Sequence, residues 1–342
     1  MTRIGLIGAG VIGRTHAQAI ASTPGFELAG VADPFPSGAA LAEEFGAPVY
    51  RDHHELLATG GVDAVIIATP NDLHVPMALD AVAAGIPTLV EKPIATTSAE
   101  AQALVAASEA RGVPVLVGHH RRHHPVVRRA KEMIASGRLG RIVAVSATAF
   151  LRKPSDYFDV AWRREHGTGG PFLINLIHEV DLLRHLVGEI SQVSALASSA
   201  TRGFDVEDTG AIALSFAEGA LAGLVVSDAA TGPWSWDLTA GDSPRFPVHD
   251  VDSHRIGGER AALTLPDLHV WEHDGPAEWT TPQHADREQV VFEDPYVVQL
   301  RHLGEVAAGL AAPLVDAREG ARDLEIVEAV TASAQTGSVV AV

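Results

Sequence analysis

The sequence has no cysteine, only three tyrosines and no long hydrophobic run among its 342 residues. Without cysteine, the chain cannot form disulfide bonds, thiolate nucleophiles or thiolate metal sites. No apolar stretch approaches the roughly 20 residues that a membrane-spanning helix needs. Basic residues are also few, with 25 against 43 acidic residues and a net charge of −18. This balance argues against nucleic acids and anionic membranes as partners, because both attract a basic surface.

The remaining composition is that of a compact globular protein. Hydrophobic residues make up 46% of a chain that is long enough for two domains and a sizeable core. We therefore expect small molecules as binding partners. The first expected strand begins at Arg3 with no charged-then-apolar leader before it, so we expect a cytoplasmic protein without a cleaved signal.

The first chemical motif is a group of glycines. The stretch TRIGLIGAGVIGRTHAQAI gives a short apolar strand, then Gly8, Gly10 and Gly13, and then a helical run. This G-x-G-x-x-G spacing between strand and helix is typical of dinucleotide-binding folds, where the glycines allow a tight turn, approach of the pyrophosphate and close packing. The phosphates of a dinucleotide lie at the helix N-terminus. We therefore expect Val11 and Ile12 to bind the cofactor together with the three glycines.

An acidic residue follows at the spacing that a dinucleotide site requires. The strand FELAGVAD ends at Asp33, 20 residues after Gly13. A carboxylate there can bind the adenosine ribose hydroxyls and repel a 2′-phosphate. Pro34 and Phe35 come next, rather than the arginine or serine that would suit a phosphate. The sequence therefore predicts NAD in preference to NADP. The alternative is a structural glycine turn with an incidental surface acid.

Three further apolar runs, VDAVIIAT, IPTLVEKP and VPVLVGHH, resemble parallel strands covered on both faces. We expect helices between them at residues 74–84 and 98–111. Ligands of such sheets bind beyond the carboxyl ends of the strands. Those ends are rich in polar residues, and we expect the following to bind the cofactor: Thr69, Pro70, Asn71, His74, Glu91 and Lys92. For His74, a purely structural position at a helix N-terminus is the alternative.

The order of these motifs, with ATPNDLH, EKP and GHHRRHHP at the strand ends, resembles the glucose-fructose oxidoreductase and inositol dehydrogenase family (Gfo/Idh/MocA). The resemblance implies that Lys92 is catalytic and lies beside the nicotinamide. A fixed ammonium next to a substrate hydroxyl favours the alkoxide that develops as hydride leaves the carbon. Glu91 is expected to hold that ammonium in place and keep it charged. A salt bridge at a domain edge is the alternative for this pair.

Beyond Gly118 the pattern changes to a helix, HPVVRRAKEMIASGRLG, followed by strand-like segments with turn residues between them. These segments are RIVAVSATAF, VSALASSA, TGAIALSFA, LAGLVVSDAA and AALTLP. They predict a largely antiparallel sheet. The low content of apolar residues in RFPVHDVDSHRIGG predicts a loop, and AREGARDLEIVEAVTASAQTG is expected to form a C-terminal helix.

The expected fold is thus an α/β Rossmann-type NAD-binding domain at residues 1–120 and a C-terminal α+β domain at residues 121–342, built on a largely antiparallel, open-faced sheet. The family resemblance implies that the second domain binds the substrate. It also implies that the open sheet face joins copies of the chain into a homodimer or homotetramer.

A second group of polar residues lies in WRREHGTGGPFLINLIHEVDLLRHL. If residues 175–187 form a helix, Asn175, His178, Asp181 and His185 share one face. The family has a glycine-rich turn leading into a helix with H-x-x-D, and His178 and Asp181 match it. Histidine titrates near working pH, so His178 is expected to be the general base. Asp181 would orient that imidazole or bind a second hydroxyl. A structural histidine is the alternative for His178, and for His185 it is the favoured interpretation.

This chain departs from the family pattern at one position. Many members have an aspartate four residues before the histidine, where this chain has Ile174 followed by Asn175. An asparagine can bind a substrate hydroxyl but cannot act as a base. Catalysis is therefore expected to rest on Lys92 and His178.

Other substrate contacts are expected from Arg121 or Arg122 and from Trp162 and Arg163. An aromatic plane suits a sugar ring, and a guanidinium can bind hydroxyls or a carboxylate. The histidines of GHHRRHHP raise the alternative of a metal site, since imidazole suits zinc or iron. Adjacent histidines point in different directions, and the family has no metal here, so we expect none.

Together these motifs predict an NAD-dependent dehydrogenase that oxidises a secondary alcohol of a cyclic polyol or sugar. The alcohol would bind between Lys92 and His178, giving its proton to His178 and its hydride to the nicotinamide. Two alternatives stay open. One is a cyclic dihydrodiol dehydrogenase. The other is a protein that retains NAD without net turnover, as an NAD-assisted glycosidase or a redox sensor does.

Overall fold

A computed structural model describes residues 1–165 and 167–342. The chain divides into two compact units. The first consists of Met1–His123 and Glu293–Leu324, and the second of His124–Phe292 and Glu325–Val342. The first unit thus includes a late segment of the chain, Glu293–Leu324, which the expected domain limits assign to the C-terminal domain. None of the helices in the described part of the chain is long and apolar enough to cross a membrane.

The first unit is built on a six-stranded parallel sheet with the order β3-β2-β1-β4-β5-β6. The chain fills one half of the sheet, from β1 to β3, and then crosses over to β4, so the strand order reverses between β1 and β4. This confirms the predicted Rossmann-type fold. The strands are β1 Thr2–Ile7, β2 Phe26–Ala32, β3 Val49–Tyr50, β4 Ala64–Ile67, β5 Thr88–Val90 and β6 Val115–Val117.

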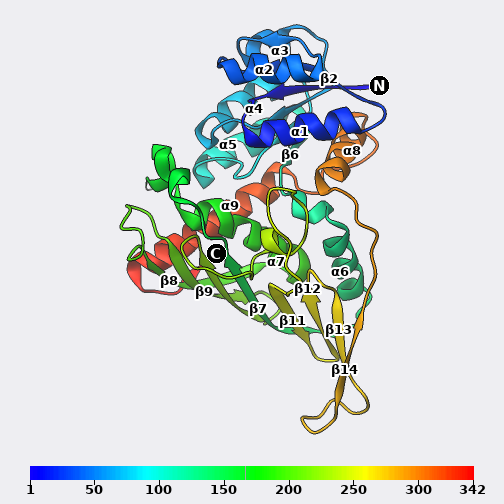
Figure 1. The fold of residues 1–342 in the computed structure, drawn as a ribbon, viewed down its shortest axis with the longest axis vertical. Coiled ribbons are helices and arrows are strands. Elements are labelled where there is room, and N and C mark those ends of the chain that lie inside the picture. The colour runs from blue at the N-terminus through cyan, green and yellow to red at the C-terminus, as the bar shows by residue number, and fades with distance from the viewer. Residues whose placement is uncertain (166) are drawn as a thin grey trace. The chain divides into compact units, whose positions relative to one another are not determined.

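Helices of the first unit form two groups of neighbours (Figure 1). One group is α1 Val11–Ser22, α2 Pro36–Phe45 and α8 Pro295–Ala307, and the other is α3 His53–Ala58, α4 His74–Ala83 and α5 Ser98–Arg111. Both expected helices, 74–84 and 98–111, are present. Helix α8 was not expected from the sequence. Its residues Leu300, Leu303 and Val306 are buried in the same core as Ile4 and Leu6 of β1, and this packing explains why the first unit includes residues so late in the chain.

The second unit is built on a nine-stranded sheet with the order β14-β13-β12-β11-β7-β10-β9-β8-β15. Within this sheet, the pairing of β7 with β10 is the only parallel one among the described strands. This confirms the largely antiparallel sheet that the sequence predicts. The strands are β7 Ile142–Phe150, β8 Ile190–Ser198, β9 Thr209–Phe216, β10 Leu221–Ser227, β11 His254–Gly258, β12 Ala261–Leu265, β13 His269–His273, β14 Gln283–Arg287 and β15 Val340–Ala341.

One sequence prediction in this unit is wrong. The segment RFPVHDVDSHRIGG was expected to be a loop, but its last five residues form β11, which pairs with β7 and β12. His254 and Ile256 are buried while Arg255 between them is exposed. Buried and exposed residues alternate here over only three positions, and two glycines follow. This pattern is too short to predict a strand.

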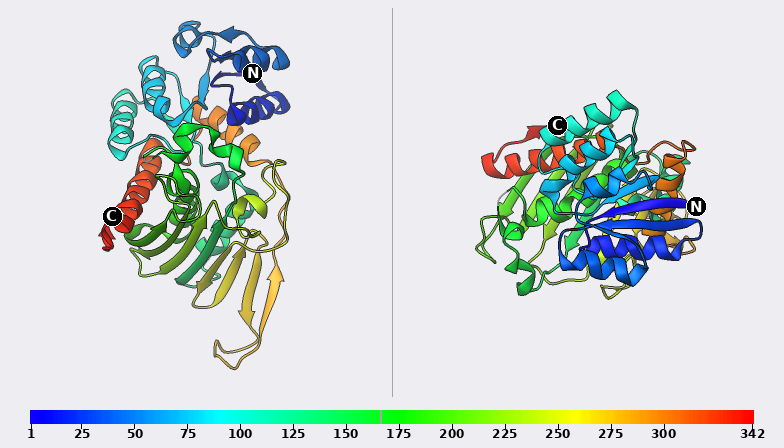
Figure 2. Two further views of the ribbon diagram at one scale, coloured as in Figure 1. Left: turned by 60° about the vertical axis from the view of Figure 1, so that its left-hand side comes forward. Right: turned by 90° about the horizontal axis from the view of Figure 1, so that it is seen from above.

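Helices cover one face of the second sheet (Figure 2). They are α6 Pro125–Ala135, α7 Ile177–Val187 and the later part of α9 Ala317–Thr336. In β10, Ala222, Leu224 and Val226 are buried, whereas Leu221 and Val225 on the opposite face are exposed. The sheet therefore has an open face, as predicted.

Candidate functional site

The glycine turn lies between β1 and α1 and gives each glycine a distinct role. Gly8 has a φ of +98°, and a Cβ there would lie 2.6 Å from the Ala68 carbonyl oxygen. A Cβ on Gly13 would overlap the carbonyl oxygen of Gly8, so a side chain would separate helix from turn. A Cβ on Gly10 would meet nothing within 4 Å. The turn therefore leaves open space at Gly10 and is closely packed at Gly8 and Gly13.

The N-terminus of α1 fits an anionic ligand. Gly10 is its N-cap and has no side chain to cap the first turn. Val11, the first helical residue, is exposed, and Ile12 is half-buried. Exposed N–H groups and the helix dipole favour negative charge at such an end. The residues present therefore fit the diphosphate of a dinucleotide.

Asp33 is bound to the glycine turn itself. Its Oδ2 accepts a hydrogen bond from the Ala9 N–H at 2.7 Å, and its Oδ1 accepts one from the Phe35 N–H at 2.8 Å. The carboxylate thus joins the end of β2 to the turn, while Pro34 and Phe35 are exposed beside it. A half-buried acid beside the turn fits a ligand with a free ribose diol.

The polar residues after β4 surround His74. Thr69 and Asn71 are half-buried and Pro70 is exposed. His74 is buried, with Nε2 at 2.9 Å from the Thr69 carbonyl oxygen and Nδ1 at 2.8 Å from the Pro93 carbonyl oxygen. Burial lowers the pKa of His74, although both carbonyls act in the opposite direction. The ring thus lies between the loops after β4 and β5, which fits a structural position, and contact of His74 with the cofactor stays a prediction.

Glu91 and Lys92 stand at the carboxyl end of β5, where Glu91 is buried and Lys92 half-buried. The Glu91 Oε1 lies 2.7 Å from His16 Nε2, and its Oε2 accepts a hydrogen bond from the Lys92 backbone N–H at 3.2 Å. Burial raises the pKa of Glu91, but the His16 hydrogen bond and the charges of His16 and Lys92 outweigh it and lower the pKa overall. Gly118 leaves room for this carboxylate, because a Cβ there would lie 2.8 Å from it.

His16 and Tyr296 also lie at this site, although the sequence did not predict either of them there. The His16 ring meets the Tyr296 ring edge-on at 5.5 Å, and Tyr296 stacks on His120 at 4.6 Å. His16 comes one helical turn after Gly13, so its place near the glycine turn could be inferred from spacing alone. Its pairing with Glu91 could not, because the two residues are 75 positions apart.

The segment GHHRRHHP is largely buried. Arg121 and Arg122 are both buried, and Arg122 forms an ion pair with Glu319 at 3.0 Å. His119 lies 3.5 Å from Asp323, and burial lowers the pKa of His119 to about 3. The structure thus places both arginines in the interior and gives Arg122 a carboxylate partner within its own unit.

In the second unit, the predicted helix begins with an irregular turn. Residues Phe172–Leu176 form a π-helical turn, and α7 continues from Ile177. His178 and Asp181 are buried in α7. Glu179 turns to the sheet, where its Oε2 lies 2.6 Å from His254 Nε2. π-Helical turns are frequent at functional sites, and this one carries Asn175.

Lys153 contacts the predicted substrate residue Asn175 and was not itself predicted. Its Nζ donates to Asn175 Oδ1 at 2.9 Å and lies 4.8 Å from the centre of the Tyr157 ring. The Arg163 guanidinium lies 4.1 Å from the same ring and 5.4 Å from Trp162. Lys153 follows the half-buried strand β7, whereas Lys92 follows β5, all of whose residues are buried.

Residues 2–119 match the oxidoreductase family with an NAD-binding Rossmann fold, and residues 127–249 match the Gfo/Idh/MocA C-terminal domain. The chain belongs to the Gfo/Idh/MocA family. This membership was predicted from its motifs. As a Gfo/Idh/MocA protein it is an NAD-binding oxidoreductase, and its relatives include named dehydrogenases and reductases.

Two relatives of this Gfo/Idh/MocA chain match it over nearly its full length. Rhizopine catabolism protein MocA of Rhizobium meliloti is 28% identical over 337 residues, which are 96% of this chain and 94% of the relative. The scyllo-inositol 2-dehydrogenase (NAD(+)) of Bacillus subtilis is 29% identical over 347 residues, 98% of this chain and 94% of the relative.

A solved structure shares this architecture. The WlbA dehydrogenase from Bordetella pertussis, in complex with NADH and UDP-GlcNAcA, has a TM-score of 0.81 and 29% sequence identity to this chain. The likeness covers 100% of this chain and 98% of that chain.

Proposed function

We propose that the protein is an NAD-dependent dehydrogenase that oxidises a secondary alcohol on the ring of a cyclic polyol or sugar. The observation that carries this proposal is the position of Lys92. It stands half-buried at the carboxyl end of β5, next to a carboxylate that His16 holds, in a chain whose family binds NAD. The relative named scyllo-inositol 2-dehydrogenase supports a ring alcohol as substrate.

The cofactor would be held by the glycine turn, the N-terminus of α1, and Thr69, Pro70 and Asn71. Once bound, it supplies the acceptor for the hydride. We propose NAD over NADP because Asp33 places a carboxylate beside the glycine turn, where a 2′-phosphate would be repelled. The exposed Pro34 and Phe35 offer no positive charge to offset that repulsion.

Lys92 and His178 would both act on the hydroxyl group of the reacting alcohol. The Lys92 ammonium stabilises negative charge on the alcohol oxygen as it develops. His178 accepts the hydroxyl proton, and Asp181, one helical turn further along α7, positions the His178 ring. The hydroxyl proton thus goes to His178 as the C–H hydride leaves, and the alcohol becomes a ketone.

We propose that side chains of the second unit determine which substrate is bound. The Arg163 guanidinium lies against the rings of Tyr157 and Trp162, and Lys153 contacts both Tyr157 and Asn175. We propose that these side chains contact the ring hydroxyls. The substrate contact expected from Arg121 stays a prediction, because its side chain is buried, as are those of His178 and Asp181.

The open face of the nine-stranded sheet suits self-association into a homodimer or homotetramer. It exposes large apolar side chains on several strands, which are Val143, Leu196, Leu221, Val225 and Trp271. Contiguous apolar surface on a sheet is an association site more often than free surface. A cytoplasmic location is proposed with this function, because the cofactor is an intracellular metabolite.

The test is NADH formation with NAD+ or NADP+ across a panel of inositols, aldoses, anhydrosugars and cyclic dihydrodiols. We expect activity with NAD+ on one class of ring. Lys92→Met and His178→Asn are each expected to lower kcat by about 10²–10⁴-fold, the usual range for general acid–base and charge-stabilising groups. Cofactor binding should survive both changes. Full kcat in either variant would refute its role.

If the protein binds NAD+ tightly but forms no NADH with any compound of the panel, the alternative of a protein that retains its cofactor is favoured. NAD released on denaturation of the purified protein would then identify that class.

A further inference from the structure

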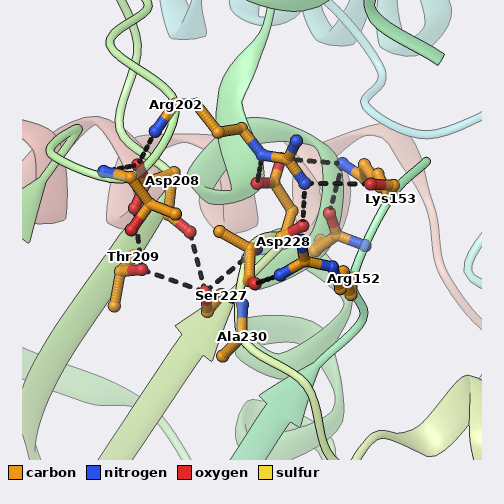
Figure 3. Close-up of polar contacts among 11 residues, drawn as sticks. Arg152, Lys153, Arg202, Asp208, Thr209, Ser227, Asp228 and Ala230 are labelled. Atoms are coloured by element: carbon orange, nitrogen blue, oxygen red, sulfur yellow. Dashed lines mark hydrogen bonds and ion pairs between the residues drawn. The ribbon is translucent and has the colours of Figure 1, made fainter. Parts of the chain in front are cut away.

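A buried charge network lies where several strands of the second sheet end (Figure 3). Lys153 follows β7, Asp208 precedes β9, and Asp228 follows β10. Arg202 donates from Nε to Asp228 Oδ1 at 2.8 Å, and the Lys153 Nζ lies 3.6 Å from Asp228 Oδ2. Asp208 accepts hydrogen bonds from the backbone N–H groups of Thr201 and Arg202, each at 2.9 Å. The sheet end thus holds Lys153 through one shared carboxylate.

From this network Lys153 reaches the start of α7. Its Nζ donates to Asn175 Oδ1 at 2.9 Å. An ammonium has donors and no acceptor, so the amide group of Asn175 must present its oxygen to Lys153 and its NH2 group to the other side. Asn175 is half-buried. Among residues 1–165 and 167–342, no hydrogen bond is donated by that NH2 group to another residue.

A charged side chain that is 9% exposed is unusual at a sheet end. A buried ion pair is often no better for stability than apolar residues of similar volume. The cation–π contact with Tyr157 and the bond to Asn175 are both made on the side of the predicted substrate residues. The position of Lys153 is therefore better explained by its contact with Asn175 than by a contribution to the stability of the fold.

We propose that Lys153 is a positioning residue that fixes Asn175 with its NH2 group directed at the substrate. The inference rests on the proposed function and deepens it. Asn175 then acts as a donor, so the substrate must offer an oxygen lone pair there, as a hydroxyl, ether or carbonyl oxygen does. A protonated amino group has no lone pair and is rejected at this position. Lys153 takes no part in the hydride or proton transfer.

The kinetic test is a double-mutant cycle with Lys153→Met and Asn175→Ala. Lys153→Met leaves Asp228 paired with Arg202, so it creates no unpaired carboxylate. Loss of one oriented hydrogen bond is expected to raise KM roughly 5- to 10-fold with kcat nearly unchanged. Lys153→Arg, which keeps a donor, should restore most of the affinity. In the Asn175→Ala background, Lys153→Met should have no further effect on KM. If the two substitutions raise KM independently, so that their effects multiply in the double variant, the proposal is wrong.

A matched control is Lys131→Met, on α6 of the same unit, where the ammonium donates to the His185 carbonyl oxygen. We expect its KM to equal that of the wild type. If Lys131→Met raises KM as much as Lys153→Met does, the effect is a general one of lost lysine and the proposal fails.

A second measurement does not depend on activity. The side-chain NH2 signal of Asn175, identified in a ¹⁵N spectrum by its loss in Asn175→Ala, should move in Lys153→Met and stay in place in Lys131→Met. If the signal does not move in Lys153→Met, the proposed orientation of Asn175 by Lys153 is refuted, even if the enzyme is inactive on every ring tested. Lys153→Leu is the replacement if Lys153→Met does not fold. Absence of turnover with a shifted signal would count against the proposed function alone.

Discussion

The imidazole of His16 and the carboxylate of Glu91 form a buried pair, with 2.7 Å between Nε2 and Oε1. The pair joins the helix after the glycine turn to the residue before Lys92. It therefore couples the two parts of the first unit that the proposed function uses, the cofactor turn and the catalytic lysine.

His16→Ala should destabilise the protein strongly, because it leaves a buried carboxylate without its partner. Breaking a buried pair costs about 3 kcal/mol or more of unfolding free energy. Urea denaturation followed by circular dichroism is the measurement, since all five tryptophans lie in the second unit and would not report on this one. The matched control is His284→Ala, whose pair with Asp274 is solvent-exposed. Equal losses in the two variants would contradict the prediction.

Acid should destabilise the protein through His119. Burial lowers its pKa to about 3 in the folded state, from 6.5 in the unfolded chain. Between these values the unfolded state binds a proton that the folded state does not, so stability falls as pH falls below 6.5. Going from about pH 7.5 to about pH 5 should cost about 2 kcal/mol from this group. In His119→Gln the unfolding free energy, measured by urea denaturation at each pH, should lose this part of its pH dependence. If its slope against pH equals that of the wild type, the prediction for His119 is wrong.

Asp33→Asn should shift cofactor preference. The variant loses the negative charge that repels a 2′-phosphate, together with charged hydrogen bonds to the ribose. We expect kcat/KM with NAD+ to fall about 10- to 100-fold, the value of one or two such bonds, and the ratio of NADP+ to NAD+ activity to rise. Glu43→Gln, an exposed acid on α2, is the control and should change neither value. A ratio that stays constant in Asp33→Asn would exclude Asp33 as the selecting residue.

Charge on the open sheet face should dissociate the proposed oligomer. Leu196 and Leu221 are 72% and 59% exposed. Burying a glutamate in an apolar interface is costly, so Leu196→Glu with Leu221→Glu should lower the mass measured by light scattering to that of one chain. Leu310→Glu is the control, since Leu310 is 80% exposed in the first unit. An unchanged mass in the sheet variant would place any interface elsewhere.

The sequence predicted those parts of the fold whose signals are local. Gly8, Gly10 and Gly13 identify a turn by spacing, and the apolar runs at β4 to β6 identify a parallel sheet without further information. Contacts between distant segments were missed. The pairing of His16 with Glu91, and of Lys153 with Asn175, depends on where the folded chain brings strand ends and helix starts, which no local pattern encodes. Strand β11 was missed for a different reason, because its alternation is shorter than a strand signal.

His74 shows a related limit. Its position after a strand end predicts a cofactor contact, and its place between the carbonyl oxygens of Thr69 and Pro93 fits the structural alternative. A polar residue at a strand end is therefore a candidate only until its neighbours are known.

The packing of α8 on β1 has a consequence for biosynthesis. Leu300, Leu303 and Val306 complete the core around Ile4 and Leu6, so the core around β1 stays incomplete until α8 has been synthesised. All of His124–Phe292 is made in between. The dinucleotide unit thus exposes apolar surface until α8 has been made, and chains in such a state are prone to aggregation.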